Sequence, residues 1–428
     1  MSNIEERNRK IGEARKSTRL RRLSQTCKTF KFKIPTNRLS TSEKEHLKMM
    51  FVEAKWIYNY LLSKSNEIDI FDIAGNYKSL NKVSHFDKDK NLIESDITHI
   101  LSSVKQELMQ QIANQIKGLS VLKSKDKNVG KLRYKSDFNS IKFKQYGVTH
   151  YIKGNKIKIQ GIKKLIPLLG IKQLNKYDNI EFTTMNLIKE VDDYYVCLTC
   201  FFDKIKTKQN NKYKNDITGI DLGISTNLTL SNGEKINCYV EESERTKILQ
   251  AKIARSKKGS NNRYKLIKKL AHSYIKTNNK KNDLANKIVC KLLKENHLIV
   301  IQDDNLNNMK DGNKNTDRSD IIQHSILGRV KYKLKQRKDR VVWLDKWWPT
   351  TQYCNKCGEK TKLSLNERTF KCENCGYTDD RDIHAATNMI YFFLECAKLE
   401  KDIYTGQELA SGLSMLRYNH FKDKLSVQ

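Results

Sequence analysis

Two closely spaced cysteine pairs constrain this chain more than any other feature of its sequence. Fourteen residues separate the two pairs, and a glycine directly follows each pair. The four cysteines are Cys354, Cys357, Cys372 and Cys375. A CxxCG turn can direct two thiolates at one tetrahedral Zn²⁺, and two such turns complete a site with four sulfur ligands. The spacing therefore predicts a structural zinc ribbon at 350–378, with no coordination position left open for catalysis.

The remaining cysteines do not extend this metal site. Cys197 and Cys200 also form a CxxC, but they lie in a strand pattern, where residues three apart point to opposite faces. We therefore predict that both are core cysteines. Spacing provides no partner for the others, which are Cys27, Cys238, Cys290 and Cys396.

The chain is strongly basic. Its 428 residues include 82 Lys or Arg and 48 Asp or Glu, which gives a formal net charge of +34. This excess predicts a polyanionic partner, and nucleic acid is the first candidate because cationic side chains displace counterions condensed on phosphates. A membrane surface is the competing polyanion, but the sequence has no apolar run of about 18 residues and no signal-peptide pattern. We therefore expect a soluble intracellular protein with no membrane partner.

The N-terminal half has the pattern of a β-rich module with a helical insertion. Residues 1–26 are rich in Arg and Lys and lack a long apolar face, which predicts a flexible basic arm; an arm that becomes ordered on RNA is the alternative. The segment 28–35 alternates with the period of a strand. A helix is predicted to follow, with Ser42 as its N-cap. We interpret 27–210 as a β module and about 41–135 as its helical insertion.

A Lys- and Asn-rich stretch at 203–216 has the composition of a linker. Beyond it, 217–236 has the pattern of a strand, a tight turn and a second strand. This pattern predicts that Asp221 lies on the first strand and that Gly223 allows a close approach of the chain.

A long basic helical segment is predicted at about 243–296. It contains eleven Lys or Arg and no acid between Ala251 and Lys281. Because uncompensated charges on a helix face repel one another, we predict that this segment contacts nucleic-acid phosphates rather than only solvent. An apolar strand at 297–306, an amphipathic helix at 320–337 and another strand are predicted to follow.

Acidic side chains lie at three places on or at the ends of these predicted elements. Asp221 is on the first strand, Asp303 and Asp304 end a later strand, and Asp382 opens a helix. Such acids, gathered at strand ends and a helix start, can hold two divalent cations that support phosphodiester cleavage. Oxygen ligands favour Mg²⁺ or Mn²⁺. Taken singly, an Asp near a turn or an N-cap is usually structural, so their order along the chain carries the prediction.

Together these motifs resemble the TnpB family of transposon-associated RNA-guided DNA endonucleases, which are related to compact type V CRISPR effectors. The resemblance rests on GIDLG, the basic helical segment, the acid-ended strand with NLNNM, HSILGRVKYKL, the two CxxCG turns and DDRDIHAATNM. It covers residues 28 to 395.

The resemblance implies an α/β multidomain protein. Its expected parts are an N-terminal wedge-like β-barrel with a helical recognition lobe, then a RuvC nuclease domain of the ribonuclease-H type with an inserted zinc ribbon. The RuvC domain would span 211–349 and 379–398, the ribbon 350–378, and a tail 399–428. The expected partners are a guide RNA and double-stranded target DNA, with a short motif beside the target read by protein side chains. The implied location is the prokaryotic cytoplasm, at the nucleoid when DNA is bound.

The resemblance also implies that Asp221, Asp304 and Asp382 bind two Mg²⁺ and cleave DNA. One departure concerns the second acid, which in the family is normally Glu within E-D-L-N-x-x-M. Alignment on Leu306 and Met309 puts Asp304 at the Glu position, whereas a slip of one residue would put Asp303 there. Asp is one methylene shorter than Glu, and a shift of about an ångström can cost about a hundredfold in rate.

Two other functions remain open at this point. A guide-directed DNA-binding repressor would keep the nucleic-acid channels but lose cleavage, and a transposase or resolvase would use the same acids without RNA. The sequence does not distinguish a monomer from a dimer.

Overall fold

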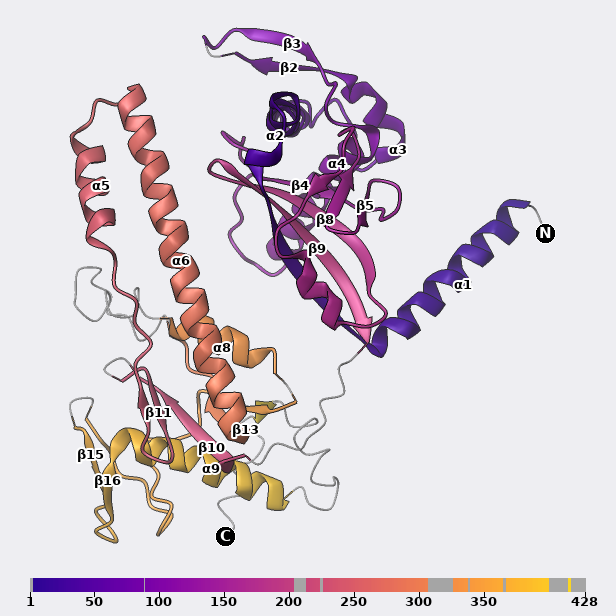
Figure 1. The fold of residues 1–428 in the computed structure, drawn as a ribbon. Helices are drawn as coiled ribbons and strands as arrows, with labels where there is room; N and C mark the ends of the chain where they lie inside the picture. The colour runs from indigo at the N-terminus through magenta and orange to yellow at the C-terminus, as the bar shows by residue number, and fades with distance from the viewer. Residues whose placement is uncertain are drawn as a thin grey trace. The chain divides into compact units, whose positions relative to one another are not determined.

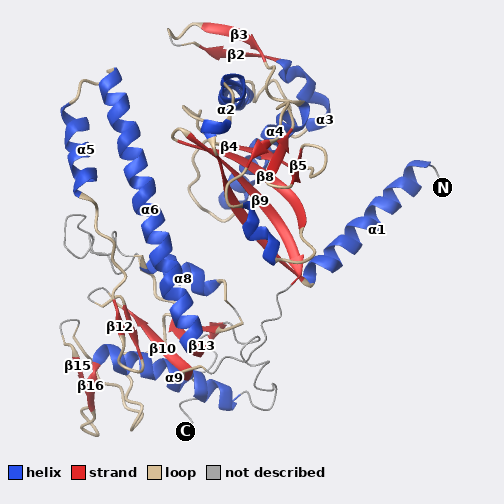
Figure 2. Cartoon of the chain, viewed as in Figure 1, coloured by secondary structure: helices blue, strands red, loops and turns tan. Residues whose placement is uncertain are grey.

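The computed structural model describes residues 3–87, 89–203, 213–223, 226–306, 326–337, 339–364, 367–399 and 415–416. The chain divides into two compact units, Met1–Lys208 and Gln209–Gln428 (Figure 1). Each unit combines helices and strands, as Figure 2 shows, so the mixed α/β class expected from the sequence is confirmed. Residues 204–212 of the expected linker and most of the expected tail lie outside the described residues.

The first unit is built on an antiparallel sheet with the order β1-β9-β8-β4. Its strands are β1 (Gln25–Ile34), β4 (Ser140–Phe143), β8 (Glu181–Glu190) and β9 (Asp193–Asp203). Along β1, Phe30, Phe32 and Ile34 are buried, whereas the alternate residues Lys31 and Lys33 point to the other face. This alternation fixes the register in which β1 pairs with β9 along its whole length.

Two smaller sheets complete the strands of the first unit. One comprises β5 (His150–Lys153), β6 (Lys156–Ile159) and β7 (Ile166–Pro167), and the other comprises β2 (Lys82–Phe86) and β3 (Leu92–Asp96). An isolated bridge between Lys33 and Leu169 links β1 to the segment after β7. The region expected to form a barrel therefore consists of a four-stranded sheet and a three-stranded sheet, which share one apolar core.

The helical insertion packs against this core. Its helices are α2 (Thr41–Ser63), α3 (Ile73–Asn76) and α4 (Ser102–Lys123). The prediction of Ser42 as N-cap was wrong, because Ser40 caps α2 in a reciprocal capping box with Glu43. The two serines are close enough in sequence to compete for this role, and Ser40 has the acid at the required third position.

The N-terminal segment forms a helix, α1 (Asn3–Leu23), rather than the irregular arm expected from its composition. Its residues are mostly exposed, and ion pairs such as Arg9–Glu13 at 3.0 Å lie along its surface. Arg21 also bonds to Glu181 of β8, so the end of the helix is attached to the sheet. Residues with good helix propensity and paired charges account for the helix without an apolar face.

The second unit contains a six-stranded sheet with the order β12-β11-β10-β13-β14-β17. Its strands are β10 (Asn215–Leu222), β11 (Leu228–Leu230), β12 (Lys235–Ile236), β13 (Asn296–Gln302), β14 (Val341–Leu344) and β17 (Met415–Leu416). The first three strands form an antiparallel meander, and β13, β14 and β17 add on in parallel. Within the expected tail, β17 is therefore part of this sheet.

Helices cover both faces of this sheet. They are α6 (Asn261–Glu295), α8 (Leu327–Lys335) and α9 (Arg381–Leu399), whereas α5 (Glu244–Arg255) packs on α6. On β13, Ile299 and Ile301 belong to the core with α6 and α8, whereas Leu298 and Val300 belong to the core with α9. Burial on both faces explains why this strand reads as a continuous apolar run.

The single helix expected at 243–296 is two helices. Ser256 ends α5, Ser260 caps α6, and Gly259 between them has a φ of +82°. That left-handed backbone reverses the chain at low cost only for glycine. Figure 1 shows α5 and α6 as neighbouring helices that extend away from the sheet. In the described ranges, no helix combines the length and apolar character needed to cross a membrane.

Candidate active site and metal centre

Asp221 lies near the end of the central strand β10, between β11 and β13. The strands β10 and β13 are parallel, and Ile220 is paired with Ile301. Asp221 and Asp304 therefore lie at the same edge of the sheet. The turn after Asp221 is tight: a Cβ on Gly223 would lie 2.4 Å from the Thr226 carbonyl oxygen. The expected strand, turn and strand, with a glycine allowing close approach, are confirmed.

Asp382 reaches the same edge from helix α9. The Asp380 carboxylate caps this helix by accepting from the backbone N–H groups of Asp382 and Ile383, at 3.0 and 3.2 Å. Lys235 in turn donates to Asp380 at 2.9 Å. The Asp382 carboxylate lies 3.5 Å from the Arg381 guanidinium, and only 16% of its side chain is exposed.

The contact between α9 and β10 is unusually close. A Cβ added to Gly219 would lie 1.8 Å from the Ala386 carbonyl oxygen, so only glycine lets the helix backbone rest on the strand. Gly219 is two residues from Asp221, and Ala386 is one turn along the helix from Asp382. This approach therefore sets the separation of the two acids.

The three acids interact through their charges. Burial of the carboxyl group is the largest effect on Asp221, followed by the negative charges of Asp382 and Asp304. Together they raise the pKa of Asp221 to about 7. Burial also raises the pKa of Asp304, against the opposing effect of the Lys331 ammonium. Asp221 is still partly exposed, so solvent or an ion can reach it.

Asp303, directly before Asp304, has different surroundings. Its carboxylate forms ion pairs with Lys331 at 2.7 Å and with Lys335 at 2.8 Å, one turn apart on α8. Burial acts to raise the pKa of Asp303, but the hydrogen bonds from the two lysines outweigh it and hold this pKa below its ordinary value. Asp303 is thus neutralised by lysines, whereas Asp304 adds to the negative field at Asp221. The NLNNM residues from 307 onward lie outside the described residues.

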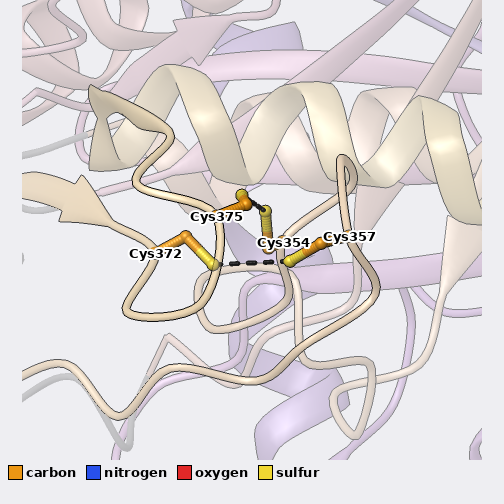
Figure 3. Close-up of side chains that lie close together, drawn as sticks. All are labelled: Cys354, Cys357, Cys372 and Cys375. Atoms are coloured by element: carbon orange, nitrogen blue, oxygen red, sulfur yellow. Dashed lines mark hydrogen bonds between the residues drawn. The ribbon is translucent and has the colours of Figure 1, made fainter.

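The four ribbon cysteines converge, as Figure 3 shows. Their sulfur atoms lie within 4.8 Å of one another, with Cys354 and Cys375 at 3.7 Å and Cys357 and Cys372 at 3.5 Å. Tetrahedral Zn–S bonds of about 2.3 Å require sulfur atoms about 3.8 Å apart, whereas a disulfide requires about 2.05 Å. The predicted cysteine cluster is therefore confirmed, and its spacing fits zinc. Within the described ranges no other set of three or more metal-ligating side chains is this tight.

The backbone of each CxxCG turn explains the convergence. Gly358 and Gly376 have positive φ values of 81° and 72°, and each donates its N–H to the first cysteine of its own pair. Backbone N–H groups of Cys375 and Asn374 also stabilise the Cys372 thiolate and lower its pKa to about 6. The second turn is flanked by β15 (Thr369–Lys371) and β16 (Thr378–Asp380), which pair antiparallel, and β16 leads into α9.

For the other CxxC, the prediction of two core cysteines is confirmed for Cys200 but was wrong for Cys197, because the two side chains lie on opposite faces of β9. Cys200 is fully buried in the core of the first unit, and burial raises its pKa to about 12. Cys197 is partly buried on the opposite face of β9.

A basic hollow lies between α5 and α6. It has a volume of about 320 Å³ and is lined by Ser243, Arg245, Lys269, His272, Ser273, Lys276, Thr277 and Lys280. The two helices are joined beside it by a hydrogen bond of 2.7 Å between Thr246 and Ser273. No acidic residue lines the hollow within the described part of the chain.

Several site residues were not foreseen from the sequence. Asp380 and Lys235, which fix the start of α9, carry no signal beyond the preference for Asp at a helix cap. The pair of lysines on Asp303 could have been found from their spacing of four on the predicted helix. Gly219 could not, because a strand glycine shows a close approach only once the partner is known.

Two family models match parts of the chain. Residues 324–389 match the sequence model of the Cas12f1-like TNB domain, and residues 201–313 match a family described as a probable transposase.

Two curated relatives are candidate RNA-guided DNA endonucleases. One, from Streptomyces pristinaespiralis, is 34% identical over 40% of this chain and 44% of its own length. The other, InsQ from Escherichia coli, is 25% identical over 41% of this chain and 48% of its own length. The chain therefore spans about half the length of the curated relatives it matches. These matches confirm the resemblance noted in the sequence.

Solved structures are similar at a greater distance. A Cas12f1 complex with guide RNA and target DNA has a TM-score of 0.45 at 14% identity, over 86% of this chain and 99% of that chain. CasPhi-2 bound to crRNA and phosphorothioate DNA has a TM-score of 0.41 at 10% identity, over 86% and 91%.

Proposed function

We propose that this TnpB-like protein is an RNA-guided DNA endonuclease, with a RuvC nuclease domain of the ribonuclease-H type in its C-terminal unit. The observation that carries the proposal is the position of Asp221 near the end of β10, beside the parallel strand β13 that leads to Asp304. Burial there, followed by the like charges of Asp382 and Asp304, raises the pKa of Asp221 to about 7. Perturbed acids that meet at the edge of a sheet are typical of active sites. The antiparallel meander followed by parallel strands, and the names of the two curated relatives, support the same assignment.

Divalent cations fit the acids at this edge. Three carboxylates whose charges repel one another are stabilised when cations bind between them, and oxygen ligands favour Mg²⁺ or Mn²⁺. Asp221, Asp304 and Asp382 would hold two such ions. When bound, the ions lower the pKa of a water nucleophile and neutralise charge on the leaving oxygen. The chain itself sets the separation of the acids, through Gly219 and the capped start of α9.

The second acid is proposed to be Asp304 rather than Asp303. Asp303 is paired with two lysines, whereas the Asp304 charge acts on Asp221. Because Lys331 and Lys335 already neutralise the Asp303 carboxylate, this side chain is better suited to fixing α8 against the end of β13 than to binding a metal ion.

The Cys₄ cluster is proposed to bind one structural Zn²⁺. Four thiolates complete its tetrahedral shell, so the ion would hold the ribbon together and take no part in cleavage. The apolar residues packed beneath the thiols, including Phe370, are few, and a ribbon of this size needs a metal to fold.

The partners are proposed to be a guide RNA and its matched DNA. Pairing between the two strands supplies sequence specificity, so the protein needs a basic surface that contacts backbone. The net charge of +34 and the basic hollow between α5 and α6 fit that requirement. In the first unit, the four-stranded and three-stranded sheets would form the wedge-like barrel, and the insertion α2–α4 would form the recognition lobe.

Reconstitution tests the proposal. Purified chain with its copurifying RNA and Mg²⁺ is expected to cut DNA that matches the RNA and to leave mismatched DNA intact. Absence of a defined RNA would favour a transposase or resolvase instead.

A matched pair of variants tests the choice of acid. Asp304→Asn is expected to lower the cleavage rate at least about a hundredfold, because it removes a metal ligand. Asp303→Asn is expected to cost about tenfold or less. The reverse order would move the metal site to Asp303.

A guide-directed repressor is the second candidate, and the presence of Asp304 where the family has Glu favours it. DNA binding without cleavage by the reconstituted wild type would establish this function. In that case Asp304→Glu, which restores the missing methylene, is expected to recover cutting.

A further inference from the structure

A buried polar network runs from the end of β13 to the first zinc-binding turn. Its side chains belong to Gln302, Thr350, His384 and Asn388, each at most 5% exposed. Gln302 directly precedes Asp303 and Asp304, and His384 follows Asp382 by two residues. The network therefore begins and ends beside the proposed metal ligands.

The strand end of the network is fully hydrogen-bonded. The Gln302 amide donates to the carbonyl oxygens of Asp345 and Trp348, at 3.2 and 2.9 Å. Its own oxygen accepts from the Thr350 hydroxyl at 2.7 Å. Every hydrogen-bonding atom of this side chain is thus used to fix the end of β13 against the segment that leads into the ribbon.

The helix end meets the ribbon at two backbone carbonyls. The Asn388 amide donates to the carbonyl oxygens of Thr350 and Tyr353, at 2.7 and 2.6 Å. The His384 ring, one turn earlier on α9, donates from Nε2 to the same Tyr353 oxygen at 2.8 Å. Tyr353 directly precedes the zinc-binding Cys354, so the first turn of the ribbon is tied to the helix that carries Asp382.

Ring packing adds a second tie between the ribbon and α9. His384 stacks on Phe370, with ring centroids 3.9 Å apart and an interplanar angle of 18°. Phe370 is fully buried and packs with Cys354 and Cys372 in the core of the ribbon. A loss of order at the cysteines would therefore displace the surface on which His384 rests.

We infer that this network positions the acids, so that an ordered Cys₄ cluster is required for metal binding at Asp221, Asp304 and Asp382. The inference rests on the proposed function. The helix end is not fully paired, because His384 Nδ1 and Asn388 Oδ1 are buried without a hydrogen-bond partner. The bonds that are present have few alternatives, because a further unpaired group in a low-dielectric interior would be costly. A displacement of about 1 Å at the acids is enough to lower a cleavage rate about a hundredfold. Gln302, Thr350, His384 and Asn388 are positioning residues that touch neither DNA nor the cations.

Thr350 offers a matched pair of variants. Thr350→Val keeps the shape of the side chain but removes the hydroxyl that binds Gln302, whereas Thr350→Ser keeps the hydroxyl. Mn²⁺ binding to the full chain, followed by electron paramagnetic resonance, reports on the acids without any cleavage. The visible absorption of a cobalt-substituted Cys₄ cluster reports on the ribbon.

For Thr350→Val we expect Mn²⁺ affinity to fall at least about tenfold and cleavage to slow about ten- to a hundredfold, with the cobalt spectrum and DNA binding unchanged. Thr350→Ser should stay within about threefold of wild type. A Thr350→Val chain with wild-type Mn²⁺ affinity, or one whose losses match its loss of folded protein, would overturn the inference.

The converse variant breaks the cluster instead of the network. Cys375→Ser is expected to lose zinc and to weaken Mn²⁺ binding by a similar factor. Undiminished Mn²⁺ affinity in a folded, zinc-free chain would also overturn the inference. A wild type that binds Mn²⁺ but cuts no DNA would refute the nuclease proposal alone, since the Mn²⁺ measurements would still decide the role of the network.

Discussion

Each unit of the chain surrounds a carboxylate with protein, but the two carboxylates have opposite neighbours. In the first unit, Glu53 of α2 is 1% exposed and accepts from the backbone N–H groups of Thr98, His99 and Ile100, at 2.9 to 3.1 Å. The His99 ring adds a contact of 2.7 Å. Every oxygen of this side chain has a donor, and its charge fixes the loop that leads into α4.

Asp221 in the second unit has acids for neighbours instead. Asp382 and Asp304 oppose its ionisation, and Arg381 offsets this only in part. Asp221 also remains partly exposed. The comparison shows that burial alone does not distinguish a structural carboxylate from a functional one; the distinction is whether the protein supplies hydrogen-bond donors to the carboxylate or leaves its charge to an ion.

The strongest test of this comparison is Asp221→Asn. Removal of one ligand is expected to lower cleavage at least about a thousandfold, equivalent to about 4 kcal/mol of transition-state stabilisation. Without Mg²⁺ the variant should be as stable as wild type or more so, because it removes a charge that its neighbours oppose. Thermal unfolding in Mg²⁺-free buffer measures this, and marked destabilisation would contradict the assignment.

Glu53→Gln should have the opposite result. Its NH₂ group cannot accept, so backbone donors lose their partner, and we expect a loss of about 3 kcal/mol in the free energy of unfolding. Urea denaturation measures this. The fraction that stays folded should cut DNA at the wild-type rate. A rate loss comparable to that of Asp221→Asn would remove the contrast between the two acids.

Gly219→Ala sharpens the comparison by moving the acids without changing them. The new methyl group would meet the Ala386 carbonyl, so α9 must shift, which we expect to cost about 2 kcal/mol of stability. The cleavage rate should fall by more than the loss of folded protein explains, because Asp382 moves with the helix. Gly118→Ala in α4 is the control, because no atom lies within 4 Å of its added Cβ. Equal effects of the two substitutions would contradict the proposed close approach.

The smallest expected effect is a pair of opposite pH dependences in metal-free protein. Burial lowers the pKa of His150, in the first unit, from 6.5 to about 4, so its contribution to stability is complete above pH 6.5 and is lost as the pH falls toward 4. The pKa of Asp221 is raised from 3.8 to about 7, so its contribution is present below pH 3.8 and is lost as the pH rises toward 7.

Hydrogen exchange in chelator, resolved by unit, separates the two contributions. Asp221→Asn should remove the Asp221 contribution to the pH dependence of the second unit between pH 4 and 7 and leave the pH dependence of the first unit unchanged. An unchanged slope in the second unit would show that Asp221 does not titrate there.

Local patterns predicted much of this molecule. The alternation around Phe30 and Phe32, the apolar run of β13 and the spacing of the cysteine pairs each reflect a short-range requirement. An error of two residues arose where two residues of the same kind compete for the N-cap, at Ser40 and Ser42. The helix at 3–23 was missed because a helix without an apolar face leaves no periodic signal.

The sequence by itself determined the metal-binding turns, the acids available to the site and the basic charge, because each depends on residue type and spacing alone. Only the tertiary structure decided which neighbour each acid has. Asp303 and Asp304 are adjacent and chemically identical, yet the Asp303 carboxylate pairs with two lysines, whereas the charge of Asp304 acts to raise the pKa of Asp221. Both residues lie just beyond the end of β13, and their surroundings come from α8 and from Asp221 on β10, which are distant in sequence.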